Sequence, residues 1–222
     1  MRFVPVKSEE TQGATSVFRV RELLIRQRTQ SINALRGHLT EFGQIVPKGS
    51  ANVARLVKLV EDPASGLPPR VVATLKVLVD VIAGFDVQIA QLDVETWQRA
   101  RENETARLLM TIPGIGQLIA TAILVFAPPP ETFRRGRDFA AWFGLVPPQY
   151  STGGKQRLGA TTKMGEGSLR RLLILGANNV IIMRHIHPAA RPGTWLAGML
   201  SRKPPMLVRG HWRTRWRGSS GL

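Results

Sequence analysis

Residues 107–126 read RLLMTIPGIGQLIATAILVF, and this stretch decides what kind of domain the chain can form. Two short apolar segments of helical character are separated by Ile112-Pro113-Gly114-Ile115-Gly116. Pro113 has no amide hydrogen to donate, and Gly114 and Gly116 permit a tight turn with positive φ. The stretch therefore predicts two helices joined by a tight turn.

The turn at Gly114 and Gly116 is expected to leave backbone amides pointing outward at the start of the second helix. Free amides and the helix dipole attract phosphate. This pattern is typical of a helix-hairpin-helix over 107–126, which holds a nucleic-acid backbone without reading the bases. The pattern leaves one alternative open, a plain helical turn that happens to contain Gly and Pro.

Apolar residues upstream of this stretch recur at three- and four-residue steps. They predict a short helix over 53–60 and a long helical stripe over 71–92, in which Gly84 is the one weak point. They also predict an amphipathic helix over 16–42, whose apolar stripe consists of Val17, Val20, Leu24, Ile32, Leu35, Leu39 and Phe42. Charged residues lie mostly off the long stripe, so we expect it to pack against another helix rather than to hold a ligand. The fold class that follows is mostly α, with a long helical, coiled-coil-like arm, a small helical domain, and a short hairpin over 151–161. Dimerisation through this arm is a hypothesis.

Composition excludes several classes of protein. The chain has 222 residues, 43% of them hydrophobic, which is enough to build a core and argues against wholesale disorder. It has no Cys, so disulfides, Cys-ligated zinc, iron–sulfur clusters and cysteine nucleophiles are excluded. We find no secretory signal and no apolar run near the roughly 18 residues that span a bilayer. We therefore expect a soluble protein of the cytoplasm with no membrane partner.

Positive charge is concentrated at the C-terminal end. The chain carries 31 Lys and Arg against 15 Asp and Glu, a net charge of +16. Residues 151–222 hold 13 of the cationic side chains and a single acid, Glu166. This polarity indicates a polyanionic partner, and DNA or RNA is the commonest one. The alternative is a basic surface without a partner.

Residues 144–180 carry the candidate chemistry. Ser151 and Thr152 precede a Gly-Gly turn, and cations follow at Lys155, Arg157, Lys163 and Arg170. A hydroxyl that attacks a phosphodiester needs cations around the phosphorus and a backbone that permits close approach. On spacing alone, this stretch is equally a basic, glycine-rich loop that binds phosphate passively.

The same residues resemble a known family. YSTGGKQRLGATTKMGEGSLRRLLILGA over 150–177, with LLMTIPGIGQLIATAIL before it, is similar to the C-terminal domain of insertion-sequence transposases of the IS one-ten and IS eleven-eleven type. The match is close over 107–177. MRFVPVKSEETQ at 1–12 and RELLIRQRTQSINALRGHLTEFG at 21–43 also resemble the linker helices of that family, so the resemblance extends over 1–205.

The resemblance implies DNA transposition or recombination by a serine that forms a covalent phosphoserine link with DNA. Ser151 is the first choice for this nucleophile and Thr152 the second. DNA-binding roles would fall to Gly114, Gly116, Lys155, Arg157, Lys163 and Arg170. The partners implied are DNA, a structured guide RNA, and a homo-oligomer or a mixed oligomer with an intact transposase, which would place the protein with the nucleoid.

The family's acidic domain, which binds Mg²⁺, has no counterpart in this sequence. Glu9, Glu10, Glu22 and Glu41 do not fall in a matching motif, so we expect no metal site in this chain and Mg²⁺ only on the missing N-terminal domain. The chain then looks truncated at its N-terminus and inactive alone. The alternative function is a non-catalytic nucleic-acid-binding protein that regulates full-length transposases.

The C-terminal residues depart from the family pattern. Relatives continue with an apolar helix such as VALANKMARIVWAL, whereas this chain reads RGHWRTRWRGSSGL over 209–222. One back-translation of 211–222 restores that helix in the neighbouring frame, so we expect a frameshift product rather than a selected basic arm. The predicted organisation is a helical arm over 1–100, a transposase C-terminal domain over 101–190, and a basic tail without order over 191–222.

Overall fold

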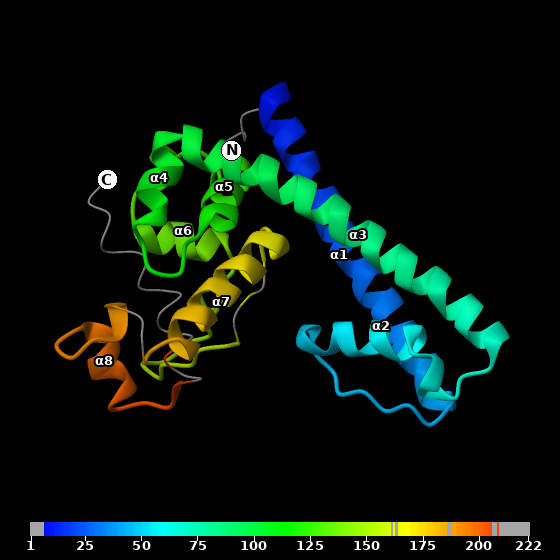
Figure 1. The fold of residues 1–222 in the computed structure, drawn as a ribbon. Coiled ribbons are helices and arrows are strands. Elements are labelled where there is room, and N and C mark those ends of the chain that lie inside the picture. Colours follow the sequence, from blue (N-terminus) through cyan, green and yellow to red (C-terminus); the bar gives the residue numbers. More distant parts are fainter. Residues whose placement is uncertain (1–6, 161, 163, 186–187, 206–207, 209–222) are drawn as a thin grey trace. The chain divides into compact units, whose positions relative to one another are not determined.

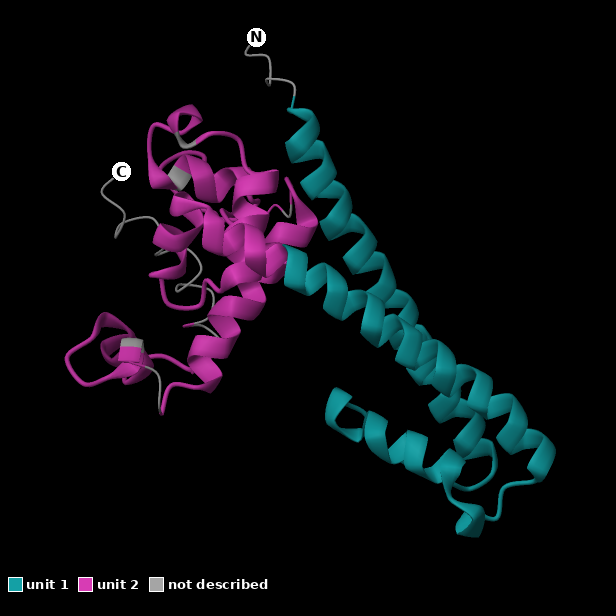
Figure 2. Cartoon of the chain, turned by 45° about the horizontal axis from the view of Figure 1, so that its top comes forward, with its two compact units in different colours: residues 1–95 teal, residues 96–222 magenta. Residues whose placement is uncertain are grey.

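The computed structural model describes residues 7–160, 162, 164–185, 188–205 and 208. It is mostly helical, with 69% helix and no strand among those residues, as the sequence predicts. The chain divides into two compact units, residues 1–95 and residues 96–222 (Figure 2). The helices are α1 (Glu9–Glu41), α2 (Val53–Glu61), α3 (Pro69–Glu102), α4 (Glu104–Met110), α5 (Gln117–Phe126), α6 (Gly136–Trp142), α7 (Gly167–Ile182) and α8 (Trp195–Leu200), and short 3-10 turns lie at 50–52, 63–65, 130–132 and 188–190.

The first unit is built on two long helices, α1 and the larger part of α3, which lie side by side (Figures 1 and 2). Ser8 caps α1, since its hydroxyl accepts a hydrogen bond from the amide of Thr11. Pro69 stands at the first position of α3, where its missing amide hydrogen costs nothing. Gly84, the weak point of the predicted stripe, does not interrupt the helix.

Ion pairs and a shared core hold this unit together. Arg21 pairs with Asp93 and Arg28 with Asp86, so residue numbers rise along α1 as they fall along α3 and the helices run antiparallel. The buried core residues come from α1, α2, α3 and the segment after α1: Ile32, Leu35, Leu39, Val46, Leu56, Val60, Leu75 and Ile82. The predicted stripe on α3 therefore faces a partner helix, as helical packing requires.

The early part of α1 differs from the predicted stripe. Ala14 and Phe18 are buried, whereas Val20, which the stripe placed inward, is 46% exposed. The stripe correctly includes Ile32, Leu35 and Leu39, but Phe42 at its end is also exposed. A helix of 33 residues drifts relative to a straight partner, so one spacing rule does not hold along its whole length.

The second unit is organised around α5, whose residues are mostly buried on all sides. α4 and α7 both pack against α5. Beside them, Phe133, Phe139, Trp142 and Phe143 meet edge to face, with ring centroids 4.5 to 6.3 Å apart. Phe143 is only 1% exposed, so these rings form core rather than an open stacking surface.

The predicted disorder over 191–222 is wrong for its first part. Thr194 caps α8 by accepting a hydrogen bond from the amide of Ala197, and Leu196, Met199 and Val208 are buried against α7 residues. Thr194 precedes apolar residues at helical spacing, and this pattern is a helix start signal that accounts for α8. The expected tail over 209–222 lies outside the described residues. No described helix combines the length and the apolar character that crossing a membrane requires.

Candidate functional site

The predicted serine segment forms a short hairpin over 148–159. Its paired residues exchange hydrogen bonds from the amide of Tyr150 to the carbonyl of Arg157 (2.8 Å) and from Gly159 to Pro148 (2.9 Å). Gly153 and Gly154 form the turn with φ of +58° and +77°. Two consecutive positive φ values are those of a type I′ turn, which suits a two-residue hairpin and favours glycine. The short hairpin that we expected near Ser151 is therefore present.

Ser151 is half-buried beside the second arm of this hairpin. Its Oγ accepts a hydrogen bond from the Arg157 amide at 3.0 Å and another from Gln149 Nε2 at 3.1 Å. Both donors use lone pairs of the oxygen, so the hydroxyl hydrogen stays available to donate elsewhere. Two N–H groups fixed on one oxygen stabilise the negative charge that grows on it when the proton leaves. This arrangement suits a nucleophile.

Thr152, the second candidate, has a different setting. It is exposed, and its carbonyl accepts the Lys155 amide at 3.2 Å across the turn. Side chains alternate between the two faces of a hairpin. Thr152 therefore lies on the same face as Lys155 and Arg157, and Ser151 on the opposite one. The structure gives Ser151 the better-fixed oxygen and Thr152 the more cationic face, so both remain predictions.

The predicted cations fall into three groups. Lys155 and Arg157 are exposed on the hairpin, where they are free to meet a phosphate from solvent. Lys163 lies outside the described residues. Arg170 is half-buried on α7, and its Nη1 donates to the carbonyl oxygens of Phe143 (3.1 Å) and Met164 (2.7 Å).

The bonds of Arg170 tie the two ends of the loop that carries the hairpin. Gly165 lets the same two ends of the loop come close together, since a Cβ at this position would lie 1.9 Å from the carbonyl oxygen of Trp142. The phosphate-binding role of Arg170 stays a prediction, and the contacts of its Nη1 also make it an anchor for the hairpin. Sequence alone shows no sign of this, because a backbone acceptor leaves no mark in the residue pattern.

The turn between α4 and α5 is tight, as predicted, but only Gly114 has a positive φ, since φ at Gly116 is −92°. The Ile115 amide donates to the Ile112 carbonyl at 3.0 Å, with Pro113 and Gly114 between them and φ of +89° at Gly114. Proline followed by a positive-φ glycine is the signature of a type II turn. Gly116 is exposed and begins α5 without a side-chain cap, so the first amides of α5 are available to an anion.

Gly114 also allows close packing against α7, which the sequence pattern of the turn did not predict. A Cβ on Gly114 would lie 2.9 Å from the carbonyl oxygen of Gly176, and one on Gly176 would lie 2.1 Å from that of Gly114. The turn therefore packs backbone to backbone against α7. A glycine at 176 inside an apolar helix was the available signal, because such a residue marks close packing.

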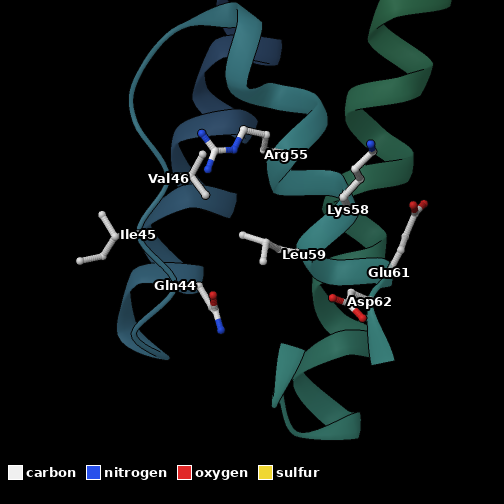
Figure 3. Close-up of a pocket in the computed structure, with 8 residues that line it drawn as sticks. All are labelled: Gln44, Ile45, Val46, Arg55, Lys58, Leu59, Glu61 and Asp62. Carbon is white, nitrogen blue, oxygen red and sulfur yellow. The ribbon is translucent and has the colours of Figure 1, made fainter. Parts of the chain in front are cut away.

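Other features of the described residues do not add a site. They contain no group of three or more His, Asp or Glu side chains that could hold a metal ion. A shallow groove in the first unit is lined by both cations and anions, so it does not suit a polyanion: Gln44, Ile45, Val46, Arg55, Lys58, Leu59, Glu61 and Asp62 (Figure 3).

Comparison with known proteins gives the context of the hairpin. Residues 106–192, which contain the α4–α5 turn, the hairpin and α7, match the family described as Transposase IS116/IS110/IS902 family. The chain is 38% identical over 209 residues to a protein of Sinorhizobium fredii named as a transposase, and these residues are 94% of this chain and 54% of that protein.

Two further relatives agree. A family 20 transposase of Pseudomonas aeruginosa is 40% identical over 210 residues, which cover 94% of this chain and 62% of the relative. The transposase for insertion sequence element IS1328 of Yersinia enterocolitica is 36% identical over 208 residues, with 94% and 61% covered. The chain thus spans little more than half the length of the relatives it matches. Its residues 106–192 are similar to the Transposase IS116/IS110/IS902 family, and the relatives that it matches over 91–94% of its length are named as transposases.

Proposed function

We propose that this chain acts in DNA transposition as the part of an insertion-sequence transposase that binds DNA and carries the serine nucleophile. The observation that carries the proposal is the Ser151 oxygen, held by the Arg157 amide and by Gln149 Nε2. It lies inside the segment that matches the transposase family. Exposed Lys155 and Arg157 lie on the other face of the same hairpin, where they are open to the DNA backbone.

The proposed step is a transesterification at a DNA phosphodiester. Ser151 Oγ attacks the phosphorus and forms one O–P bond, while the bond from phosphorus to one DNA oxygen breaks. The hydroxyl proton passes to solvent, and the leaving oxygen takes up a proton in turn. One phosphoester bond replaces another, so a DNA hydroxyl can later attack the phosphoserine link and rejoin the strand. Gln149 Nε2 and the Arg157 amide stabilise the charge that develops on Oγ.

The metal of the family is proposed to act from outside the described residues. Full-length relatives are expected to bind Mg²⁺ on their acidic domain, which supplies electrostatic stabilisation of the transferred phosphate. The described part of this chain has no cluster of three His, Asp or Glu side chains that fits such an ion. We therefore route no step of this chain through the metal, and we propose that an intact family member contributes it in a mixed oligomer.

The turn between α4 and α5 is proposed to work as a helix-hairpin-helix. The uncapped start of α5 at Gly116 supports this proposal, because its amides are open to a phosphate of DNA or of a structured guide RNA. Contacts of this kind position the backbone and leave sequence selection to the guide. The protein would accordingly be found with the nucleoid.

A covalent-trapping experiment tests the proposal. The purified chain is mixed with labelled element-end DNA, guide RNA and Mg²⁺, with and without an intact family member, and the mixture is run on a denaturing gel. We expect a protein–DNA adduct of the chain's own size that requires the intact partner and disappears in Ser151→Ala. Thr152→Val serves as the matched variant. If the adduct is lost in Thr152→Val and retained in Ser151→Ala, Thr152 is the nucleophile instead of Ser151.

A second function is favoured by the charge of the second unit. Residues 96–222 contain 19 Lys and Arg against five Asp and Glu, which favours binding to nucleic acid with or without chemistry. In this case the chain regulates full-length transposases by competing for DNA or by forming mixed oligomers. Absence of an adduct in every mixture, together with inhibition of the intact enzyme, would establish this role instead.

We also propose that residues 209–222 are the product of a frameshift. The support is the family helix that one neighbouring reading frame restores. Sequencing of the gene around the Arg209 codon tests the idea. Codons that yield no apolar helix in either shifted frame would contradict it.

A further inference from the structure

We propose that Tyr150 is a stacking platform for an unstacked nucleobase next to a DNA phosphate that Lys155 and Arg157 hold. This inference rests on the proposed function and deepens it, because it specifies the form of DNA that the hairpin takes. It requires an aromatic ring that is fixed in place, open on one side and surrounded by cations.

The ring of Tyr150 is fixed by its hairpin neighbours. A Cβ added to Gly159 would lie 2.7 Å from Tyr150 Cε2 and 3.0 Å from Pro148 Cγ. The ring therefore rests directly over Gly159, in the space that any other residue would fill with a side chain. The paired amides of Tyr150 and Gly159 hold the two hairpin arms in this register. Glycine at 159 is thus a requirement of the ring's position.

The rest of the ring is open to solvent. Tyr150 is 64% exposed, whereas the rings of Phe133, Phe139, Trp142 and Phe143 pack on one another in the second unit. Among the described residues, the ring of Tyr150 has no aromatic contact, although it is held in place. A nucleobase is a planar partner that such a ring stacks with.

The surrounding charges point to a nucleic acid rather than to another apolar partner. Tyr150, Thr152, Lys155 and Arg157 lie on one face of the hairpin, because side chains alternate and Tyr150 pairs with Arg157 while Thr152 pairs with Lys155. Two exposed cations beside one aromatic ring combine phosphate attraction with stacking. An apolar protein partner is disfavoured, because the contact would bury the charges of Lys155 and Arg157 against an apolar surface.

The base must be unpaired or unstacked. In a regular duplex each base already has a neighbour on both faces, so its rings are closed to Tyr150. Thr152, Lys155 and Arg157 lie on the same face as Tyr150, and residues two apart on a strand are separated by about 6.6 Å. The base that stacks on Tyr150 and the phosphate that meets these polar side chains therefore belong to the same or to adjacent nucleotides. The hairpin is accordingly expected to prefer single-stranded or distorted DNA.

The chain offers a direct probe of this contact, because Tyr150 is its only tyrosine. Replacement of tyrosine by 3-fluorotyrosine yields a single ¹⁹F resonance that reports on this ring. The full chain is prepared as Ser151→Ala to exclude chemistry. It is then titrated with a single-stranded oligonucleotide, with the matching duplex, and with abasic single strands in which one base at a time is removed.

We expect the ¹⁹F resonance to shift with the single strand and to return toward its free position when one particular base is absent. Tyr150→Ala should weaken single-strand binding about 5- to 160-fold, the range that loss of one base–aromatic stack produces, and Tyr150→Phe should retain it. The salt dependence should not change in Tyr150→Ala, since no charge is removed. Gly159→Ala, which displaces the ring, should reproduce the loss.

Two results separate failure of this inference from failure of the proposed function. If the parent chain binds the single strand while Tyr150→Ala binds it equally well and every abasic strand gives the same shift, Tyr150 is not a stacking platform. If the parent chain binds no form of DNA, the proposed function is wrong, and so is this inference. Circular dichroism of each variant verifies that the helices are intact.

Discussion

Gly114 shows, at the scale of one residue, that a turn predicted to bind DNA also has to pack against its neighbours. Its positive φ shapes the turn before α5, and its carbonyl oxygen faces the backbone of Gly176 on α7. The same residue therefore leaves the amides of α5 accessible and lets the turn approach α7. A side chain on either glycine would separate the turn from the helix.

Gly176→Ala tests this backbone contact. The new Cβ would lie 2.1 Å from the carbonyl oxygen of Gly114 and 2.8 Å from Ile119 Cδ1, so the turn or the helix must move. We expect a loss of about 1–3 kcal/mol in the free energy of unfolding, as for other overpacked cores. Gly198→Ala on α8 is the control, because a Cβ there has nothing within 4 Å.

Chemical denaturation of both variants measures the difference. Gly198→Ala should be neutral or stabilise the chain by up to about 1 kcal/mol, because alanine restricts the unfolded chain at a compatible site. Equal losses in the two variants would contradict the tight contact between Gly114 and Gly176. DNA binding by Gly176→Ala then shows whether the α4–α5 turn needs α7 behind it.

At the scale of the elements, α1 and α3 form an antiparallel pair with a defined register. Arg21 and Arg28 are seven residues apart, as are Asp86 and Asp93, so each helix presents one charge per heptad to the other. Seven residues are close to two helical turns, which returns the charges to the same side. The ion pairs therefore flank the apolar seam and favour one alignment of the two helices.

A double-mutant cycle on Arg21 and Asp93 measures this alignment. Arg21 Nε and Nη2 contact both carboxylate oxygens of Asp93 at 2.6 and 3.3 Å, and the two side chains are 17% and 22% exposed. We expect a coupling energy of about 1 kcal/mol in Arg21→Met and Asp93→Asn, from urea denaturation. The Arg28–Asp86 pair should give less, because Asp86 is 50% exposed. A coupling near zero for Arg21 would show that the apolar seam alone sets the register.

Individual elements also show how far a sequence can be interpreted. Apolar spacing predicted α2, the stripe on α3 and the helices on both sides of the Gly114 turn, because each is a local pattern. It did not predict that Arg21 meets Asp93, since 72 residues separate them and many acids offer the same charge. The Gly153-Gly154 turn was predictable from residue type. The donors on Ser151 and the anchoring role of Arg170 were not, because backbone atoms supply their partners.

At the scale of the whole molecule, charge divides along the same boundary as the fold. Residues 1–95 carry 12 Lys and Arg against 10 acids, which is nearly neutral, while residues 96–222 carry 19 against five. The acids of the first unit include Asp86 and Asp93, which pair with arginines inside it. Two cations there, Arg21 and Arg28, stabilise the fold, and the large excess in the second unit fits the proposed binding to a polyanion.

The salt dependence of DNA binding tests this division. Each phosphate contact releases condensed counterions, so the logarithm of affinity falls with the logarithm of salt by about 0.7 to 0.9 per contact. Lys155→Gln and Arg157→Gln together should therefore lower the slope by about 1.4 to 1.8 if both side chains meet phosphates. Lys76→Gln, an exposed cation on α3 in the nearly neutral unit, should leave the slope unchanged. Fluorescence anisotropy at a series of salt concentrations yields both slopes. Equal slopes for all three proteins would mean that the hairpin cations do not touch the DNA backbone, and a fall in Lys76→Gln would extend the binding surface to the arm.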